Sequence, residues 1–390
     1  MEGHDVISCE AKRHRRGTHR LVPPGETWAR ISPLLPGFGI TRVADVTGLD
    51  EVGIPVFQAV RPAGHILAVS QGKGVTAELA RISAAMESIE GWHAERVRPG
   101  VVRGSAREVG PLPYALRDLT LVPGSLVSDE LVIDWLDAVG LVSGRPVLVP
   151  RDCVLLSKLV RPGWVPLTFD ASSNGLGSGN SMTEAALHGL CEAIESDCVT
   201  RAGALPRAQR RRVDPTTVDD PICRELLALL TDSGNAVEVF DVSTELEIPC
   251  FMASIVSDVL PRRFSGAGCH PDAAVALSRA LTEAAQGRLT AIAGVRDDLA
   301  DLLYDELRPA APARTVTSAR DVQFRRTASL ATDTLEEDLT LVAERVHERT
   351  GVEPLLVDLS HPQHGIPVVM AIAPGLVCRL ESLGFGESNA

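Results

Sequence analysis

The chain is predicted to adopt an α/β (α+β) fold built from repeated units of strand, glycine turn and helix. Two observations support this prediction. Apolar, β-branched runs are intermixed along the chain with longer stretches of helical periodicity, and such intermixing is typical of mixed folds. In addition, two sequence patterns each occur three times, which indicates that one small structural unit is used repeatedly.

Short apolar runs rich in β-branched residues are predicted as strands. They are residues 54–60, 66–69, 146–150, 236–240, 249–255, 355–357 and 367–372. Helices are predicted in the stretches between them. The best candidate for an exposed connection is the Pro- and Ala-rich stretch 308–313, because proline interrupts both helices and sheets.

The first repeated pattern places an aspartate and a hydroxyl residue shortly before an Ile-Pro dipeptide and an apolar run. The three aspartates are Asp45, Asp241 and Asp358, and the prolines are Pro55, Pro249 and Pro367. A proline at the start of a strand removes no ladder hydrogen bond. We therefore expect equivalent strands that enter at the edge of each repeated unit, with a structural role.

The second repeated pattern carries the chemistry. A glycine is followed fifteen residues later by a glutamate and three residues after that by a second polar residue. Each interval is predicted to be a helix with its own apolar stripe. The three copies are Gly72-Lys73-Gly74 with Glu87 and Glu90, Gly177-Ser178-Gly179 with Glu192 and Glu195, and Gly268-Cys269-His270 with Glu283 and Gln286.

The glutamates of the first two copies form pairs, because residues three apart share one face of a helix. If the copies pack side by side, Glu87, Glu90, Glu192 and Glu195 converge. Unit charges about 4 Å apart repel by roughly 4 kcal/mol at a surface-like dielectric, so such a cluster must protonate, spread into solvent or bind cations. Oxygen ligands suit Mg²⁺, which also binds phosphate oxygens. The pattern therefore predicts a nucleotide site that depends on metal and carboxylates.

Composition excludes several other classes of protein. The net charge is −13, which argues against a general nucleic-acid binder. The sequence contains no run of eighteen apolar residues, so no membrane span is predicted. The N-terminus has no apolar signal region, and a cytoplasmic protein is therefore expected. The eight cysteines form no CxxC motif, which argues against a disulfide framework or a zinc site.

Other motifs are weaker or absent. Gly72-Lys73-Gly74 lacks the Ser or Thr that completes a phosphate-binding P-loop, and 175–179 lacks the full dinucleotide pattern. Arg288 could bind phosphate, although a surface arginine is the alternative. His361 and His364 could bind metal, but without a clear third ligand we interpret them as a loop. No nucleophile elbow occurs.

At these motifs the chain resembles the YcaO family. The resemblance is carried by residues 172–195 (SSNGLGSGNSMTEAALHGLCEAIE), 268–290 (GCHPDAAVALSRALTEAAQGRLT), and the N-terminal part with Arg20, Thr27 and 39–56 (GITRVADVTGLDEVGIPV). It covers roughly residues 18–300 and extends through the last Ile-Pro strand to about 375. It implies a single YcaO domain of residues 1–390, with the ATP and Mg²⁺ motifs in 18–300 and a C-terminal part of the same fold in 313–390.

The resemblance implies an enzyme that uses ATP and Mg²⁺ to activate a backbone amide of a peptide. Matching positions one by one implies that Glu87, Glu90, Glu192 and Glu195 bind Mg²⁺. The positions implied to contact the nucleotide are Arg20, Thr27, Ser70, Lys73, Asn180, Glu184, Gln286 and Arg288. A homodimer is expected by analogy, together with a peptide substrate and a possible leader-binding or accessory protein.

The chain departs from the family pattern in two places. Ser196 follows the last glutamate of the second motif, where the family usually has arginine, which puts the phosphate contacts in doubt. The chain ends in GFGESNA, without the Pro-rich tail of many azoline-forming members, and a fused leader-binding domain is not expected.

Three classes of function remain open. The first is a stand-alone enzyme of ribosomal peptide modification. Attack by a Cys, Ser or Thr side chain gives an azoline, attack by the N-terminal amine gives a macrocyclic amidine as in bottromycin-type pathways, and external sulfide gives a thioamide, usually with a partner protein. The second is a non-catalytic nucleotide sensor or peptide-binding partner. The third is a structural protein, for which ATP and Mg²⁺ would leave stability unchanged.

Overall fold

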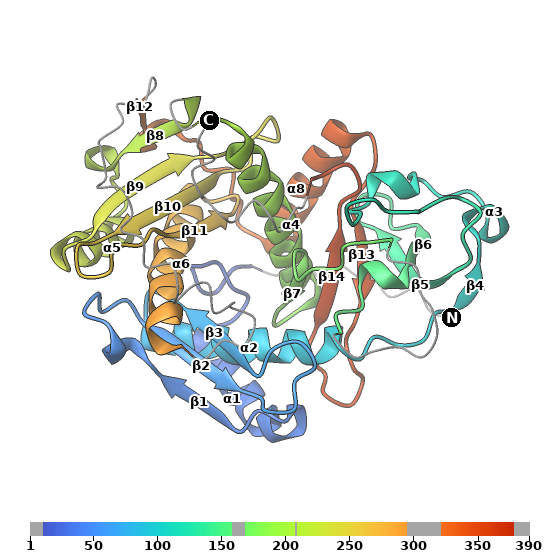
Figure 1. Ribbon diagram of the computed structural model, residues 1–390, viewed down its shortest axis with the longest axis horizontal. Helices are drawn as coiled ribbons and strands as arrows, with labels where there is room; N and C mark the ends of the chain where they lie inside the picture. Colours follow the sequence, from blue (N-terminus) through green and yellow to red (C-terminus); the bar gives the residue numbers. More distant parts are fainter. Residues whose placement is uncertain (1–10, 158–167, 207–208, 295–320, 378–390) are drawn as a thin grey trace. The chain divides into compact units, whose positions relative to one another are not determined.

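The computed structural model describes residues 11–157, 168–206, 209–294 and 321–377 (Figure 1). The chain forms two compact units. Unit 1 comprises Met1–Lys12, Glu90–Thr200 and Thr332–Gly384, and unit 2 comprises Arg13–Ile89, Arg201–Ala331 and Phe385–Ala390. Among the helices that the structure describes, none is both long enough and apolar enough to cross a membrane.

The described strands of unit 2 form two sheets. The first is antiparallel, with strand order β1 (Arg42–Asp45), β2 (Val56–Val60) and β3 (Val69–Lys73). The second has the order β11 (Phe264–Cys269), β10 (Cys250–Val256), β9 (Ala236–Asp241), β8 (Arg211–Asp214) and β12 (Asp321–Gln323). All its pairings are antiparallel except that of β12 with β8.

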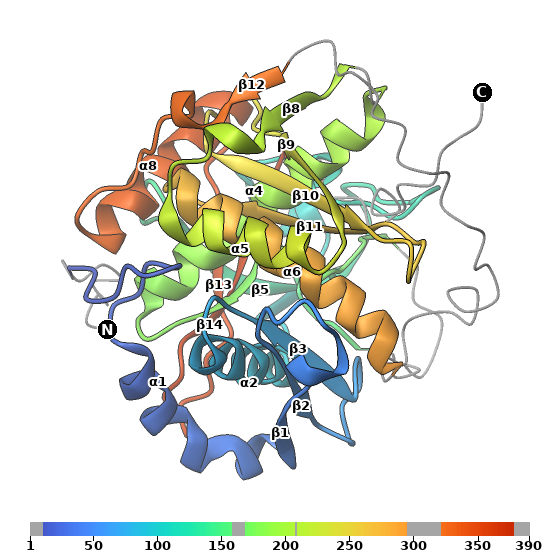
Figure 2. The same ribbon diagram turned by 90° about the vertical axis from the view of Figure 1, so that its left-hand side faces the viewer.

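Helices α6 (Ala273–Ala293) and α5 (Pro221–Asp232) cover the second sheet of unit 2. Figure 2 shows them side by side, and α6 packs against both β11 and β10. Phe251, Leu277 and Leu281 are fully buried in the shared core. Helix α1 (Pro24–Ile31) precedes β1, and Arg81 stacks on the ring of Trp28 with 4.0 Å to the centroid.

The described strands of unit 1 form a sheet with strand order β4, β5, β13, β14 and β7, and β6 pairs with β5. Trp135 is its largest fully buried side chain, and its indole nitrogen donates to the carbonyl of Gly104 at 2.9 Å. The elements are β4 (Val102–Gly104), α3 (Ala106–Val109), β5 (Ile133–Gly140), β6 (Pro146–Pro150), β7 (Leu176–Ser178), α8 (Leu335–Thr350), β13 (Leu355–Asp358) and β14 (Val368–Ile372).

Two further helices, α2 (Ala77–Ala94) and α4 (Met182–Ala204), each contribute residues to both units. Short 3₁₀ helices lie at Ser32–Phe38, Thr47–Leu49, Leu116–Asp118, Arg151–Cys153, Pro215–Thr217 and Phe324–Arg326. The predicted exposed connection at 308–313 lies outside the described residues.

The prediction of a mixed fold made of repeated units is confirmed. A hairpin, a third antiparallel strand and a following helix recur as β1–β2–β3–α2, as β9–β10–β11–α6 and as β13–β14–β7–α4. In the last of these, β7 and α4 precede the hairpin in the chain, although β14 lies between β13 and β7 in the sheet (Figure 1). The third unit is therefore assembled from two distant chain segments.

The first sequence pattern forms the turn of each hairpin. The aspartate accepts the backbone N–H two residues later, and the hydroxyl there accepts the first N–H of the following strand. The aspartate bonds are Asp45 with Thr47 (2.9 Å), Asp241 with Ser243 (3.0 Å) and Asp358 with Ser360 (2.8 Å). The hydroxyls accept from Val56 (3.1 Å), Cys250 (3.0 Å) and Val368 (3.1 Å).

The structural role of this pattern is confirmed, but the expected position at a sheet edge is wrong. Strands β2, β10 and β14 each lie in the middle of a three-strand set. The proline directly precedes the strand, so every residue of the strand can pair on both sides.

Most predicted strands are observed, but 66–69 is wrong because β3 spans Val69–Lys73. The three strands that lead into the repeated helices, β3 (VSQGK), β7 (LGS) and β11 (FSGAGC), are rich in glycine and serine. Such residues have a low intrinsic preference for strands. Packing against a helix, rather than side-chain preference, therefore accounts for these strands.

We predict that Glu247→Gly stabilises the protein. Glu247 has φ 54°, in the left-handed region, where the equivalent residues of the other hairpins are Gly53 (77°) and Gly365 (62°). Relief of this backbone conformation should raise the free energy of unfolding by about 1 kcal/mol, measured by urea denaturation. Glu247→Ala is the control, because it removes the same side chain but keeps the β-carbon. A glycine variant no more stable than the alanine variant would contradict the prediction.

Candidate active site

The second sequence pattern places the three repeated helices equivalently on their strands. A β-carbon added to the first glycine of each copy would overlap the carbonyl oxygen eight residues later and the amide nitrogen twelve residues later. The glycines and their neighbours are Gly72 with Ala80 and Ala84, Gly177 with Ala185 and Gly189, and Gly268 with Ala276 and Ala280. Each helix begins five residues after this glycine. The motif acids therefore occupy equivalent positions in the three copies.

Glu90, the second acid of the first motif, lies next to the second motif. It belongs to unit 1 and is buried. The hydroxyl of Ser178, on β7, donates a hydrogen bond of 2.5 Å to its carboxylate. Glu87 lies one helical turn earlier on α2 and is half-buried. The structure thus joins an acid of the first motif to the strand that leads into the second.

Helix α4 carries the acids of the second motif in unit 1. Glu192 and Glu195 are half-buried, and Nδ1 of His188 lies 3.7 Å from Glu192. Glu184 is buried in the first turn, where the Asn180 amide donates to its carboxylate at 3.0 Å. The predicted nucleotide-contacting pair therefore lies at the N-terminal end of the helix that carries the predicted metal-binding acids.

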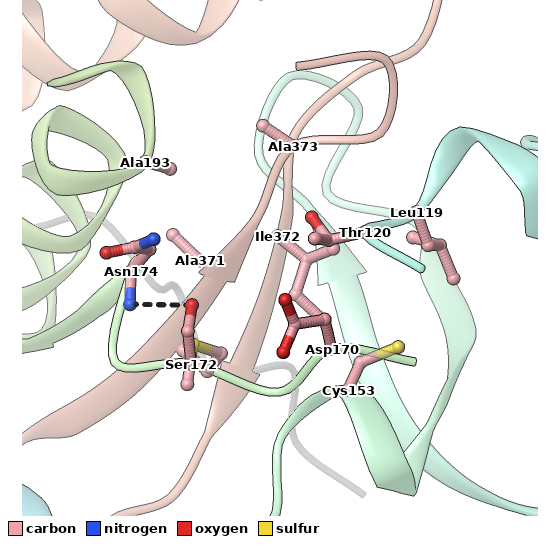
Figure 3. A pocket seen from close by; sticks show the side chains of 11 residues that line it. Leu119, Thr120, Cys153, Asp170, Ser172, Asn174, Ala193, Ala371, Ile372 and Ala373 are labelled. Atoms are coloured by element: carbon pink, nitrogen blue, oxygen red, sulfur yellow. Dashed lines mark hydrogen bonds between the residues drawn. The ribbon is translucent and has the colours of Figure 1, made fainter. Parts of the chain in front are cut away.

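Ser196, which directly follows the last glutamate of the second motif, contacts the loop before β7. The amide of Asn174 donates to its hydroxyl at 2.9 Å. Asn174 also lines a small cavity in unit 1 with Ser172 and Asp170 (Figure 3). Its volume of about 50 Å³ corresponds to a few water molecules. This cavity is therefore too small to hold a nucleotide.

The third motif contacts the first within unit 2. The Lys73 ammonium lies 2.6 Å from the Glu283 carboxylate, and the Thr290 hydroxyl donates to the Gln71 side chain. Oε1 of Gln286 is buried and has no hydrogen-bond partner among the residues that the structure describes. A buried acceptor without a donor is costly, so this atom is suited to a ligand that donates hydrogen bonds or carries a cation.

Arg288 is engaged by other protein groups. Its guanidinium bonds both carboxylate oxygens of Asp50, at 2.8 and 3.3 Å, and the hydroxyl of Ser257 at 2.9 Å. The side chains of Arg288 and Asp50 are 3% and 4% exposed. This geometry ties the first hairpin to α6 and accounts for Arg288 without a phosphate.

The remaining predicted residues lie in unit 2. Arg20 ends an N-terminal segment in which Gly17 contacts Val75 and accepts a hydrogen bond of 3.2 Å from Ser278. This segment therefore lies near the turn of the first copy and against the helix of the third. Thr27 on α1 and Ser70 on β3 are buried.

The sequence did not predict Ser178 or Asp50 as functional or structural partners. Ser178 could have been found from its repeat position, because it matches Lys73 and Cys269 directly after the first glycine. Asp50 has no comparable repeat position that would have identified it, and its partner Arg288 lies 238 residues away in the sequence.

Comparisons with known proteins identify relatives over nearly the whole chain. A family model described as YcaO cyclodehydratase, ATP- and Mg²⁺-binding, matches residues 71–377. An uncharacterized protein of Mycobacterium tuberculosis (strain H37Rv) is 40% identical over 372 residues, 93% of this chain and 84% of that protein. An uncharacterized protein of Rhizobium leguminosarum bv. trifolii, named for the tfuA 3′ region, is 37% identical over 397 residues, 95% of this chain and 93% of that protein.

Solved structures show the same fold. YcaO from Methanopyrus kandleri bound with AMPPCP and Mg²⁺ has a TM-score of 0.72 at 25% identity, covering 94% of each chain. A heterocyclase in complex with substrate and cofactor has a TM-score of 0.77 at 20% identity, covering 95% of this chain and 54% of that one. The chain therefore spans about half the length of that heterocyclase.

We predict that Asp50→Asn strongly destabilises the protein, because it leaves the buried Arg288 guanidinium without its counter-charge. Loss of one partner of a buried ion pair typically costs about 3–5 kcal/mol of unfolding free energy, measurable by chemical denaturation. Glu26→Gln is the matched control, since Glu26 pairs with Arg13 at 2.8 Å but both side chains are more than half exposed. It should cost about 1 kcal/mol or less. Equal effects of the two variants would refute the structural role of the Arg288 pair.

Proposed function

Because the chain belongs to the YcaO cyclodehydratase family, we propose that it uses ATP and Mg²⁺ to activate a backbone amide of a ribosomally made peptide. The activated amide undergoes cyclodehydration, forming a macrocyclic amidine or an azoline. The observation that carries this proposal is the equivalent placement of the motif acids on repeated glycine–helix units, with Glu90 bonded to the second motif through Ser178.

The donor set suits Mg²⁺. We propose Glu87, Glu90, Glu192 and Glu195 as its ligands, because Mg²⁺ prefers carboxylate oxygens together with phosphate. Within unit 1, the Ser178 bond joins Glu90 to β7, the strand against which the helix of Glu192 and Glu195 packs through Gly177. A bound cation would offset the repulsion between these carboxylates.

The proposed nucleotide contacts are those that the family resemblance implies. Glu184 and Asn180 form one hydrogen-bonded pair, and the buried Oε1 of Gln286 needs a partner. Arg20, Thr27, Ser70 and Lys73 stay proposed nucleotide contacts. For Arg288 we propose a supporting role, because its guanidinium is already bonded to Asp50 and Ser257.

Bound ATP supplies the phosphoryl group that turns the amide oxygen into a leaving group. The chain's own residues then need only hold the cation, orient the peptide and exclude water, since the nucleophile comes from the substrate. The raised pKa values of two thiols, those of Cys153 and Cys223, support this division of roles. Burial raises the pKa of Cys153 well above its usual value, and that of Cys223 likewise, which keeps both protonated and poorly nucleophilic.

A second candidate product is a thioamide made with a sulfur donor. The Rhizobium relative is named for its place beside tfuA, and thioamide-forming members are expected to work with a partner protein. A gene next to a close relative is a natural source of such a partner. The predictions of one domain for residues 1–390, a homodimer and a cytoplasmic location also remain proposals.

Candidate precursor peptides incubated with the protein, ATP and Mg²⁺ test these products by intact-mass spectrometry. We expect the peptide to lose the mass of one water, and fragmentation then distinguishes an azoline from a macrocycle. Exchange of one oxygen for one sulfur in the presence of sulfide and the partner would indicate the thioamide. Glu192→Gln with Glu195→Gln should abolish either change, because the cation loses two ligands. ATP binding without product from any peptide would favour a non-catalytic nucleotide- or peptide-binding role.

A further inference from the structure

Within each unit, the residue at one position of the repeat contacts another copy of the repeat. The residue directly after the first glycine of a motif bonds to an acid on the helix of another motif. In unit 1 the Ser178 hydroxyl bonds Glu90 at 2.5 Å. In unit 2 the Lys73 ammonium bonds Glu283 at 2.6 Å. The two contacts are formed by different residue types at equivalent positions of β7 and β3.

Strand geometry accounts for this recurrence. Successive side chains of a strand point to opposite faces. Gly177 and Gly179 both face α4, where a β-carbon on either would lie within 2.7 Å of backbone atoms of Ala185. Ser178 must therefore point away from α4, and its pairing with Val368 fixes the register. The same alternation around Gly72 and Gly74 directs Lys73 away from α2.

The chemical difference between the two residues is informative. A serine hydroxyl donates a hydrogen bond to Glu90 and brings no positive charge that would compete with a cation for the carboxylate. A lysine ammonium offsets the charge of Glu283, whose copy also has Gln286 in place of the second glutamate. The two copies thus differ in the way expected if Glu90 binds a cation and Glu283 does not.

We propose that Ser178 is a positioning residue that orients the Glu90 carboxylate for Mg²⁺. Ser178 is itself 5% exposed and Glu90 is 9% exposed, so solvent competes little for this hydrogen bond. The inference rests on the proposed assignment of Glu90 as a Mg²⁺ ligand, but it does not depend on the identity of the peptide product.

The test is a titration of the full chain with Mg²⁺ at a fixed concentration of AMPPCP. Binding is measured by calorimetry and by the change in thermal stability. Ser178→Ala is expected to raise the Mg²⁺ concentration at half-saturation about tenfold, since hydrogen bonds to charged groups are among the stronger ones. Ser105→Ala is the matched control. Ser105 is another buried serine of unit 1 whose hydroxyl donates to a carboxylate, that of Glu108 at 2.9 Å, but it lies outside the motifs.

A double-mutant cycle separates positioning from general loss of stability. In a Glu90→Gln background, Ser178→Ala should have no further effect on Mg²⁺ half-saturation, because the group that it orients is gone. An unchanged half-saturation in Ser178→Ala, an equal shift in Ser105→Ala, or full additivity with Glu90→Gln would each overturn the proposal. Product formation is read separately: its absence, with the Mg²⁺ shift intact, bears on the proposed reaction alone.

Discussion

Direct contact between helix backbone and strand backbone sets the geometry on which the rest of the molecule depends. In each repeat a glycine of the strand lies where a β-carbon would overlap the main chain of the following helix. The contact fixes how far each helix lies from its strand and which face it presents. It also explains why residues fifteen and eighteen positions later are equivalent in all copies, and why the single side chain between two glycines points toward a different helix. Backbone packing thus determines where the carboxylates lie.

The repeats, the helices and the fold class could be predicted from the sequence, because spacing and periodicity are local properties. The glycine-rich strands could not, since β7 is a strand only when α4 and β14 lie against it. The candidate site was likewise predictable only in part. Its acids follow from spacing and from the family resemblance, whereas the bond from Ser178 to Glu90 joins residues 88 positions apart. Pairing over such distances depends on topology, which one sequence does not display.

Each unit also contains a buried ion pair that includes none of the motif acids. In unit 1 the Lys12 ammonium bonds Asp338 at 2.5 Å with both side chains fully buried, and Thr332 donates to the same carboxylate at 2.7 Å. In unit 2, Arg288 and Asp50 play the comparable part. Buried charges persist only when they are paired and hydrogen-bonded. These two pairs join chain segments that are far apart in sequence, and they leave the carboxylates of the proposed metal site as a chemically separate group.

The divided third repeat affects the order in which the chain can acquire its structure during synthesis. The copies in unit 2 present their hairpin first and their helix last, so each is complete as soon as its helix has left the ribosome. The copy in unit 1 presents β7 and α4 first, and β7 cannot pair with β14 until Val368–Ile372 have been translated. Pairing between distant segments is slow, and the strand that carries Ser178 has an unpaired edge in the meantime. During synthesis, Glu192 and Glu195 therefore lie on a helix whose preceding strand is among the last to pair in its sheet.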